Sequence, residues 1–550
     1  LTPLLAAPVD FASIEATGEA DLDLLAVRGV SAKVVTGGAA IEIEGDLART
    51  PERQPGELAV IGALDVRVPG ELPLETVVAL WPVNLASSAR SWGETNVEAG
   101  KARNAVGKVT LQRDSMAEGH LRDTDLEVTF EVEDARVKFL PDLPAVENGR
   151  GKGRLTGNSF RVVADSADYS GWTVSEGLVD FPAIYPRGSE FRVFAKGRGP
   201  ARNIIRVLAD SRLQFDLDPA RVSGDAEMTY EMFRPALSDV PYEDMRFTAF
   251  GKLRNAGLKA AAFSFDFTGG IVDVNVDQKG IVLAGQGSLG PSPVDFTWSD
   301  TFAEDGKPAA LVAKGLVTPD FLNGFGLLGR AYMTGEAPLD VTATLEGANL
   351  TTANVKIDFT GARLDAAEIG WLKPRGGASA ATINYSLAGD RATSRVNFSA
   401  DGAALDGDFT LGPDTRLMSA DLRRAYFRNV ADVNGKVSRN AADQLVLKLG
   451  GKHLDVSGLM PGLGTLSADE REGRGGMSLD AAVDRLTLRA GLDLRNAKVA
   501  MTSGKNGFET FKASGTAGGG APLEASIDAR QGAPKLDVTT GDAGFRSEER

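Results

Sequence analysis

The chain has 550 residues, with 64 glycines, no cysteine, 60 basic and 75 acidic side chains, and a net charge of −15. A missing cysteine excludes disulfides, thiolate zinc sites and iron–sulfur clusters, and two histidines exclude a multi-histidine metal site. The acidic balance argues against nucleic acid as a partner, because neutralising phosphates requires clustered Lys and Arg. We therefore expect no cofactor, no metal and no nucleic acid.

The first predicted helices lie in the N-terminal part of the chain. One covers Leu74–Trp81, and a second covers Asn84–Glu94, where Leu85, Ala89 and Trp92 share one face. No stretch approaches the ~20 apolar residues that span a bilayer. The chain begins with Leu rather than Met, and we expect it to be a piece of a longer protein.

The dominant pattern after these helices has period two. Residues 126–133 alternate between Leu or Val or Phe and Glu or Thr, which is typical of a strand with one apolar and one solvated face. The alternation recurs along the chain, separated by Gly, Asp and Asn clusters every ~8–14 residues, as in hairpins. The sequence predicts an all-β fold: an elongated, curled antiparallel sheet of repeating β-groove units with a few short capping helices.

Two later helices are predicted from proline at their first turn, after Gly199-Pro200 and after Thr318-Pro319-Asp320. An internal repeat accompanies them, because residues 222–226 (VSGDA) resemble residues 333–337 (MTGEA). We expect three segments. Residues 1–196 form an N-terminal groove segment with helices around 74–94, residues 197–330 a middle repeat with helices near 201–209 and 319–329, and residues 331–550 the truncated C-terminal repeats.

A long apolar sheet face with few large aromatic residues predicts an open groove rather than a filled sandwich, because large exposed apolar patches normally mark binding sites. Acyl chains are its natural occupants. The residues expected to line the groove and bind lipid all lie in the apolar phase of their strands: Leu126, Val128, Phe130, Val132, Val137, Phe139, Phe263, Phe265, Val272, Val274, Phe296, Trp298, Val355, Ile357 and Phe359.

Other motifs have simpler interpretations. The GFGLLG run at 324–329 matches a dinucleotide fingerprint but follows a helix start, so we interpret it as a helix end. The glycines of 149–157 favour a turn over a phosphate cradle. His120 and His453 have no partner motif and are expected at the surface, and the carboxylates lie on polar strand faces. We expect no catalytic site and no enzyme activity.

Several motifs, in order, resemble the AsmA-like proteins of Gram-negative envelopes, particularly the YhdP-type branch. They are Leu80-Trp81-Pro82, Arg90-Ser91-Trp92, Asn96-Val97 with Gly100, the Phe139–Pro144 turn with Asn148-Gly149, and Gly370-Trp371-Leu372-Lys373-Pro374. The resemblance covers nearly the whole chain.

The resemblance implies a periplasmic protein anchored to the inner membrane through an N-terminal helix absent from this chain. Such a protein would carry phospholipids between the inner and outer membranes. The implied partners are phospholipid acyl chains, and the two membranes through regions outside this chain; other envelope proteins are further candidates.

Two rival functions remain open from the sequence. A non-transport envelope scaffold or a surface β-solenoid adhesin would suit an acidic, Gly-rich, cysteine-free chain, although an adhesin favours shorter and more regular repeats. A carbohydrate-active enzyme on a β scaffold would require clustered Trp and Tyr for sugar stacking, and this chain has only 5 Trp and 7 Tyr.

Overall fold

The structure is a computed structural model that describes residues 5–541 except 56, 84–86, 140–142, 211–216, 238–239, 263–264, 303–306, 325–328, 348, 368–369, 390, 413–416, 441–443, 458–475, 490, 505–506 and 531–534. Contacts divide the chain into two compact units. Unit 1 comprises Leu1–Ala261, Asp266–Gly287 and Ser299–Lys307, and unit 2 comprises Ala262–Phe265, Ser288–Trp298 and Pro308–Arg550.

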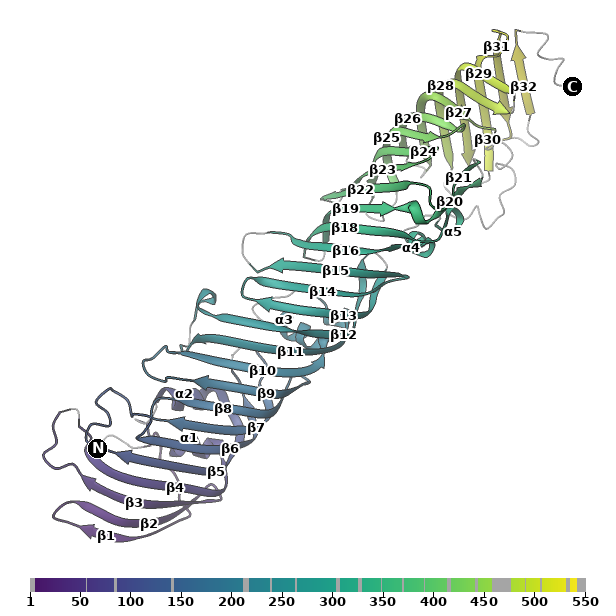
Figure 1. The fold of residues 1–550 in the computed structure, drawn as a ribbon. Helices are drawn as coiled ribbons and strands as arrows, with labels where there is room; N and C mark the ends of the chain where they lie inside the picture. The colour runs from purple at the N-terminus through teal and green to yellow at the C-terminus, as the bar shows by residue number, and fades with distance from the viewer. Residues whose placement is uncertain are drawn as a thin grey trace. The chain divides into compact units, whose positions relative to one another are not determined.

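Strands dominate the described residues, with 29 of them in one sheet and three short ones in a second (Figure 1). The first half contains β1 Ser13–Asp21, β2 Ala26–Thr36, β3 Ala39–Arg49, β4 Val60–Pro73, β5 Val97–Leu111, β6 Leu126–Val137, β7 Val146–Thr156, β8 Phe160–Tyr169, β9 Trp172–Phe181, β10 Glu190–Pro200, β11 Val222–Pro235, β12 Arg246–Ala262, β13 Phe265–Asp277, β14 Gly280–Leu289, β15 Ser292–Thr301 and β16 Ala309–Val317.

The second half contains β17 Met333–Thr334, β18 Ala337–Glu346, β19 Asn349–Asp358, β20 Arg363–Ala366, β21 Trp371–Lys373, β22 Ser379–Ala388, β23 Arg391–Ala400, β24 Ala403–Leu411, β25 Leu417–Phe427, β26 Ala431–Arg439, β27 Leu445–Asp455, β28 Met477–Arg489, β29 Leu492–Gly504, β30 Gly507–Thr516, β31 Pro522–Asp528 and β32 Lys535–Thr540. The predicted all-β fold, with a curled antiparallel sheet and few short helices, is confirmed.

Pairing follows the sequence inside each unit. In unit 1 every strand from β1 to β12 pairs antiparallel with the next. In unit 2 the strands of the large sheet also pair in order, from β16 through β18, β19 and β22 to β27. One pair departs from the expected antiparallel arrangement, because β27 and β28 run parallel, with Leu445 opposite Met477 and Asp455 opposite Thr487.

Bulges interrupt the ladders of β5, β6 and β7. The register shifts between Arg103 and Val106, between Val132 and Ala135, and between Ala135 and Val137. Left-handed backbone angles accompany these shifts at Asn104 (φ 49°), Asp134 (φ 52°) and Asn148 (φ 52°). Because each bulge bends its strand and increases the local twist, three neighbouring bulges curl this part of the sheet.

Among the described residues, five short helices accompany the strands: α1 Leu74–Leu80, α2 Ser87–Asn96, α3 Ala201–Asp210, α4 Pro319–Gly324 and α5 Gly329–Tyr332. The same residues include three 3₁₀ turns, η1 Pro219–Arg221, η2 Tyr242–Asp244 and η3 Phe359–Gly361. The hydroxyl of Thr318 accepts a 3.1 Å hydrogen bond from the amide of Phe321, so the predicted cap of α4 is present. Residues 84–86 of the second predicted helix lie outside the described residues. In the part of the chain that the structure describes, every helix is too short or too polar to cross a bilayer.

Two glycine-rich segments illustrate what the sequence left ambiguous. The expected turn at 149–157 is wrong for most of its length, because Val146–Thr156 forms β7 and only the bend at Gly157 and Asn158 precedes β8. The second segment, GFGLLG, spans two helices: Gly324 is the last residue of α4 and Gly329 the first of α5, while residues 325–328 lie outside the described part.

The short repeat has a matching backbone in its two copies. Gly224 and Gly335 occupy the same place in the repeated motif and have φ angles of 106° and 95°. A helix precedes each copy. The first copy lies at the start of β11, and the second copy leads into β18, both strands of the large sheet. The similarity between the two sequences therefore corresponds to a shared local structure.

Candidate functional site

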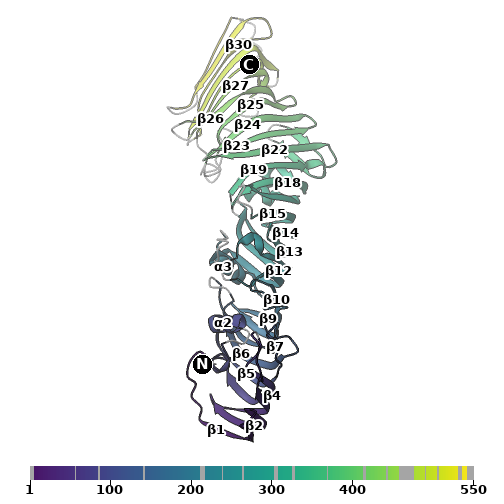
Figure 2. The same ribbon diagram turned by 90° about the vertical axis from the view of Figure 1, so that its left-hand side faces the viewer.

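Helices α1 and α2 cover one face of the sheet in unit 1, called here the inner face; the opposite face is the outer face. Val77 and Leu80 of α1 pack on a buried cluster formed by Ile41, Val68 and Leu72 of β3 and β4. Figure 2 shows α2 and α3 beside the strands of unit 1. The site predicted on β6 can be placed relative to these two faces.

The apolar residues of β6 lie on the inner face. Leu126 is fully buried, and Val128 packs against the same cluster as Trp81, which follows α1. Phe130 and Val132 are half-buried on the same face. The Phe130 ring occupies the space above Gly153 of β7, where an added Cβ would lie 2.1 Å from a ring carbon. A larger residue at position 153 would therefore displace the ring.

A bulge keeps the apolar residues of β6 on the inner face over its full length. The register shifts between Val132 and Ala135, where Asp134 has a φ of 52°. Without this extra residue Val137 and Phe139 would point outwards, since they have the opposite parity to Phe130. Instead the ring of Phe139 lies 5.9 Å from that of Trp92 in α2.

Aromatic rings continue along the inner face from α2 to β10. Trp92 also lies 6.4 Å from Phe181 of β9, and Phe181 stacks on Phe191 of β10 at 4.5 Å and 7°. Phe160 of β8 is 6.1 Å from Phe181. These contacts link four neighbouring elements through apolar surface.

Helix α3 covers the next part of the inner face. Ala201 and Ile204 of this helix pack with Trp172 and Ala226 in one cluster. The Trp172 indole N–H donates a 3.0 Å hydrogen bond to the carbonyl of Pro200, and Asn203 donates a 2.8 Å bond to the carbonyl of Ser170. These bonds fix the start of α3 against the β8–β9 hairpin.

The outer face of β4–β7 is charged. Cross-strand ion pairs join Lys101 to Glu71 at 2.8 Å, Arg103 to Glu133 at 2.9 Å and Arg154 to Glu127 at 2.9 Å. Because these pairs are exposed, each contributes only about 0–1 kcal/mol to stability. Their consequence is to keep this face solvated, as the sequence pattern predicted.

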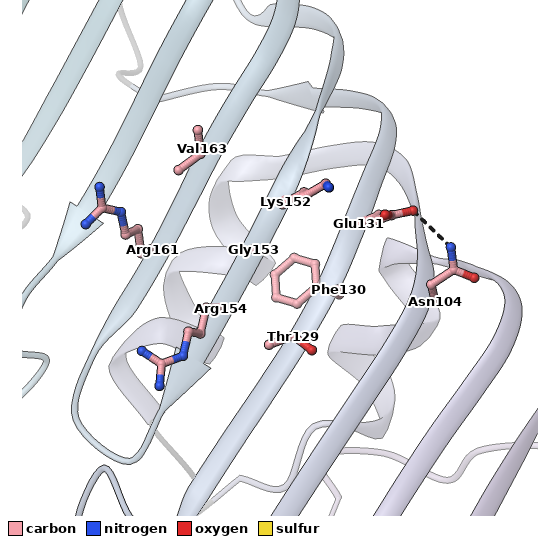
Figure 3. Close-up of a pocket in the computed structure, with 9 residues that line it drawn as sticks. All are labelled: Asn104, Thr129, Phe130, Glu131, Lys152, Gly153, Arg154, Arg161 and Val163. Carbon is pink, nitrogen blue, oxygen red and sulfur yellow. Dashed lines mark hydrogen bonds between the residues drawn. The ribbon is translucent and has the colours of Figure 1, made fainter.

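A shallow hollow lies on this outer face (Figure 3). Glu131 accepts a 2.9 Å hydrogen bond from Asn104 there. Its lining comprises Asn104, Thr129, Glu131, Lys152, Arg154, Arg161 and Val163 of the outer face, with the paired residues Phe130 and Gly153 between them on β6 and β7. Since its polar side chains belong to exposed strand positions, the hollow has the character of the charged face and not of an apolar binding site.

The remaining predicted residues lie on other strands. Val272 and Val274 are 3% and 8% exposed, while their neighbour Ile271 is exposed. In unit 2, Phe265 stacks on Phe321 of α4 at 5.2 Å. Ile357 is buried in the same cluster, with Val355 half-buried against it.

Four predicted residues of unit 2 remain, and the structure describes three of them. Phe359 is buried in the cluster with Ile357, but it begins the 3₁₀ turn η3 instead of continuing β19. Phe296 and Trp298 are half-buried on β15. Phe263 lies outside the described residues.

The C-terminal strands of unit 2 form the largest buried cluster. Leu486, Leu494 and Val499 are at most 1% exposed and pack with residues of β26, β27, β30 and β31. Here the apolar phase of the strands forms a dry core.

Sequence reasoning missed Arg234 of β11. Its register partner is Phe191, so it occupies the apolar phase after Tyr230 and Met232. The missed signal was a charged residue at a position where the alternation calls for an apolar one. Burial lowers the pKa of Arg234, and burial followed by the proximity of Tyr169 raises the pKa of Tyr230 to about 12.

The sequence of the chain is similar to one family of known proteins. A model of a family described as YhdP protein matches residues 54–531 of the chain. Comparison with curated proteins found no match. In the part of the chain that the structure describes, no group of three or more acidic or His side chains is arranged to hold a metal ion.

Proposed function

Because the chain belongs to the YhdP family of AsmA-like envelope proteins, we propose that it carries phospholipids along the inner face of its sheet. In this proposal it is a bridge-like lipid transfer protein of the periplasm, anchored to the inner membrane. It reaches the inner and outer membranes through regions outside these 550 residues, with or without other envelope proteins.

One observation carries the proposal: the contrast between the two faces of β6. Phe130 and Val132 are only half-buried on an otherwise apolar inner face, whereas Glu131 lies on the charged outer face. An apolar face that is not fully covered favours binding of an apolar ligand. Acyl chains match this face because they require apolar contact and no specific polar partner.

We also propose that the chain is not an enzyme. The described groups with shifted pKa values have structural causes. A hydrogen bond from Arg423 lowers the pKa of Asp406 on the solvated side of a strand pair, and burial lowers the pKa of Lys373. Neither group adjoins a second titratable side chain in an arrangement suited to acid–base catalysis.

Crosslinking tests the transfer proposal. A photoreactive amino acid at position 130 should capture phospholipid in cells or in lipid-replete extracts, and the same group at position 131 should capture far less. Because the two positions are adjacent in the same strand, we expect the two variants to have similar expression and similar local stability. Mass spectrometry of the crosslinked adduct identifies the lipid.

An envelope scaffold is the second candidate, favoured by the dry core of β26–β31. A scaffold requires folded, stable strands but no access for lipid. Equal capture at positions 130 and 131, or none at either in folded protein, would support the scaffold and contradict transfer.

A further inference from the structure

Arg234 places a positive charge on the inner face of unit 1. It is the last residue but one of β11, opposite Phe191 of β10, and shares its face with Met232 and Tyr230. Its side chain is 9% exposed, and its guanidinium carbon lies 5.9 Å from the centre of the Phe191 ring. Phe191 belongs to the aromatic row that extends to Trp92 of α2. The charge therefore lies beside the apolar surface, near the end of a strand.

The guanidinium is not neutralised by any carboxylate among the described residues. Nη2 donates a 2.6 Å hydrogen bond to the carbonyl of Leu237, and Nε donates a longer 3.4 Å bond to the carbonyl of Pro235. A guanidinium carries five N–H donors, so these two bonds leave donors unused. The described side chains whose polar atoms are buried without a partner are only Ser292 and Ser379. The unused donors of Arg234 therefore remain accessible.

Tyr230 and Tyr169 add hydroxyl donors near this charge. Tyr230 is 36% exposed, but its surroundings still desolvate its hydroxyl, and that desolvation, together with Tyr169, raises its pKa to about 12. Burial raises the pKa of Tyr169 to about 12 as well. Both hydroxyls therefore stay protonated at neutral pH. An arginine and two protonated tyrosines present donors to a ligand that carries negative charge.

We infer that Arg234 anchors the phosphate of a phospholipid, with Tyr230 as a second donor and the acyl chains on the adjoining surface of Met232 and Phe191. This inference rests on the proposed function and specifies where a headgroup is held. A partly buried cation without a counter-ion is costly, and a phosphate would supply the negative charge that no described residue places beside Arg234. Guanidinium and phosphate also match in geometry, because two N–H groups can bond two phosphate oxygens.

The test compares two lipids with the same acyl chains, one with and one without a phosphate-bearing headgroup. The purified chain, with Arg234→Gln, Arg234→Lys and the unchanged residue, is titrated with a short-chain phosphatidylcholine and with the diacylglycerol of the same chain length. Loss of a charge-assisted bond should weaken phospholipid binding about tenfold or more in Arg234→Gln. Diacylglycerol binding should be unchanged, and Arg234→Lys should be intermediate.

Arg246→Gln is the matched control. Arg246 of the neighbouring strand β12 lies on the outer face, 5.0 Å from the Phe233 ring and 2.6 Å from Glu190. Its replacement should leave both affinities unchanged. Circular dichroism of each variant shows whether it is folded, and if Arg234→Gln is not, Arg234→Lys and Tyr230→Phe carry the test, each with a smaller loss for phospholipid alone.

The outcomes separate this inference from the proposed function. If the unchanged chain binds neither lipid, the transfer proposal itself fails, and the inference with it. If it binds both lipids and Arg234→Gln weakens them equally or not at all, only the phosphate anchor is overturned. Inorganic phosphate is titrated separately. Binding as tight as that of the phospholipid would identify a free-anion site and also overturn the anchor.

Discussion

Strands β6–β10 and strands β28–β30 use the same alternation and differ in how completely its apolar face is covered. In β6, Phe130 and Val132 are half-buried beside two helices. In β28 and β29, Leu486 and Leu494 are 0% exposed, and six strands face one cluster. The comparison shows that period two specifies which face is apolar, whereas packing against other segments decides whether that face is partly open or fully buried.

The largest expected effect is on the free energy of unfolding when a carboxylate is placed on the apolar face of each of these two regions. Val499→Asp puts a charge into the closed cluster and should cost about 4 kcal/mol or more of unfolding free energy. Phe130→Asp lets the carboxylate reach water and should cost only about 1–2 kcal/mol, mainly from lost apolar contact. Urea denaturation of the two variants measures the difference. Equal losses would mean that the two faces are equally closed.

Lys373 extends the comparison to a charged residue in a closed region. It is 1% exposed, and its ammonium group donates to the carbonyls of Phe359, Thr360 and Ala362, which hold η3 in place. Lys373→Met leaves these carbonyls without that donor and should cost about 2–4 kcal/mol in thermal or urea unfolding.

Lys314 is the control for Lys373. Its side chain is 74% exposed and 3.9 Å from Asp340, so Lys314→Met should change stability by less than about 0.5 kcal/mol. A similar effect of the two substitutions would contradict a structural role for the buried ammonium group.

The smallest effect is a pH dependence at the parallel pair. His453 of β27 lies 3.2 Å from the hydroxyl of Thr487 in β28, and burial, followed by the charge of Arg485, lowers its pKa below 6.5. The unfolded chain therefore binds a proton more readily, so stability should fall as pH drops through 6.5 and level off below the folded pKa.

His453→Gln should remove this slope between pH 7 and pH 5. Thermal unfolding at a series of pH values measures it, and His120→Gln, on the other histidine, serves as the control. A slope that persists in His453→Gln would assign the pH dependence to other groups.

Much of the fold could be predicted because alternation and turn residues are local signals. The apolar phase of residues 126–132 identified the inner face of β6 directly. The sequence alone does not show that the apolar residues before and after Asp134 lie on the same face. The bulge that brings them to one face depends on the pairing of β6 with β5 and β7. Gly149–Gly157 resembled a turn because the sequence does not show that Phe130 packs on a glycine in the next strand.

The candidate site was less predictable than the fold. Ile357 and Phe359 followed the same apolar pattern as Phe130, but both are buried in a cluster with Phe321 of α4 and Met333, and such burial depends on contacts between segments distant in sequence. Arg234 broke the alternation visibly. Predicting its surroundings, however, would require the register between β10 and β11, which places Arg234 beside Phe191.

The order of strand pairing has a consequence for folding kinetics. In unit 1 each strand up to β12 pairs with the strand before it in the sequence, so the sheet can grow one hairpin at a time as the chain emerges. The parallel pair differs, because each paired residue of β27 meets a residue 32 positions later in the sequence, as Leu445 meets Met477. Pairing these two strands is a non-local step, and we expect it to be the slowest step in forming the C-terminal core.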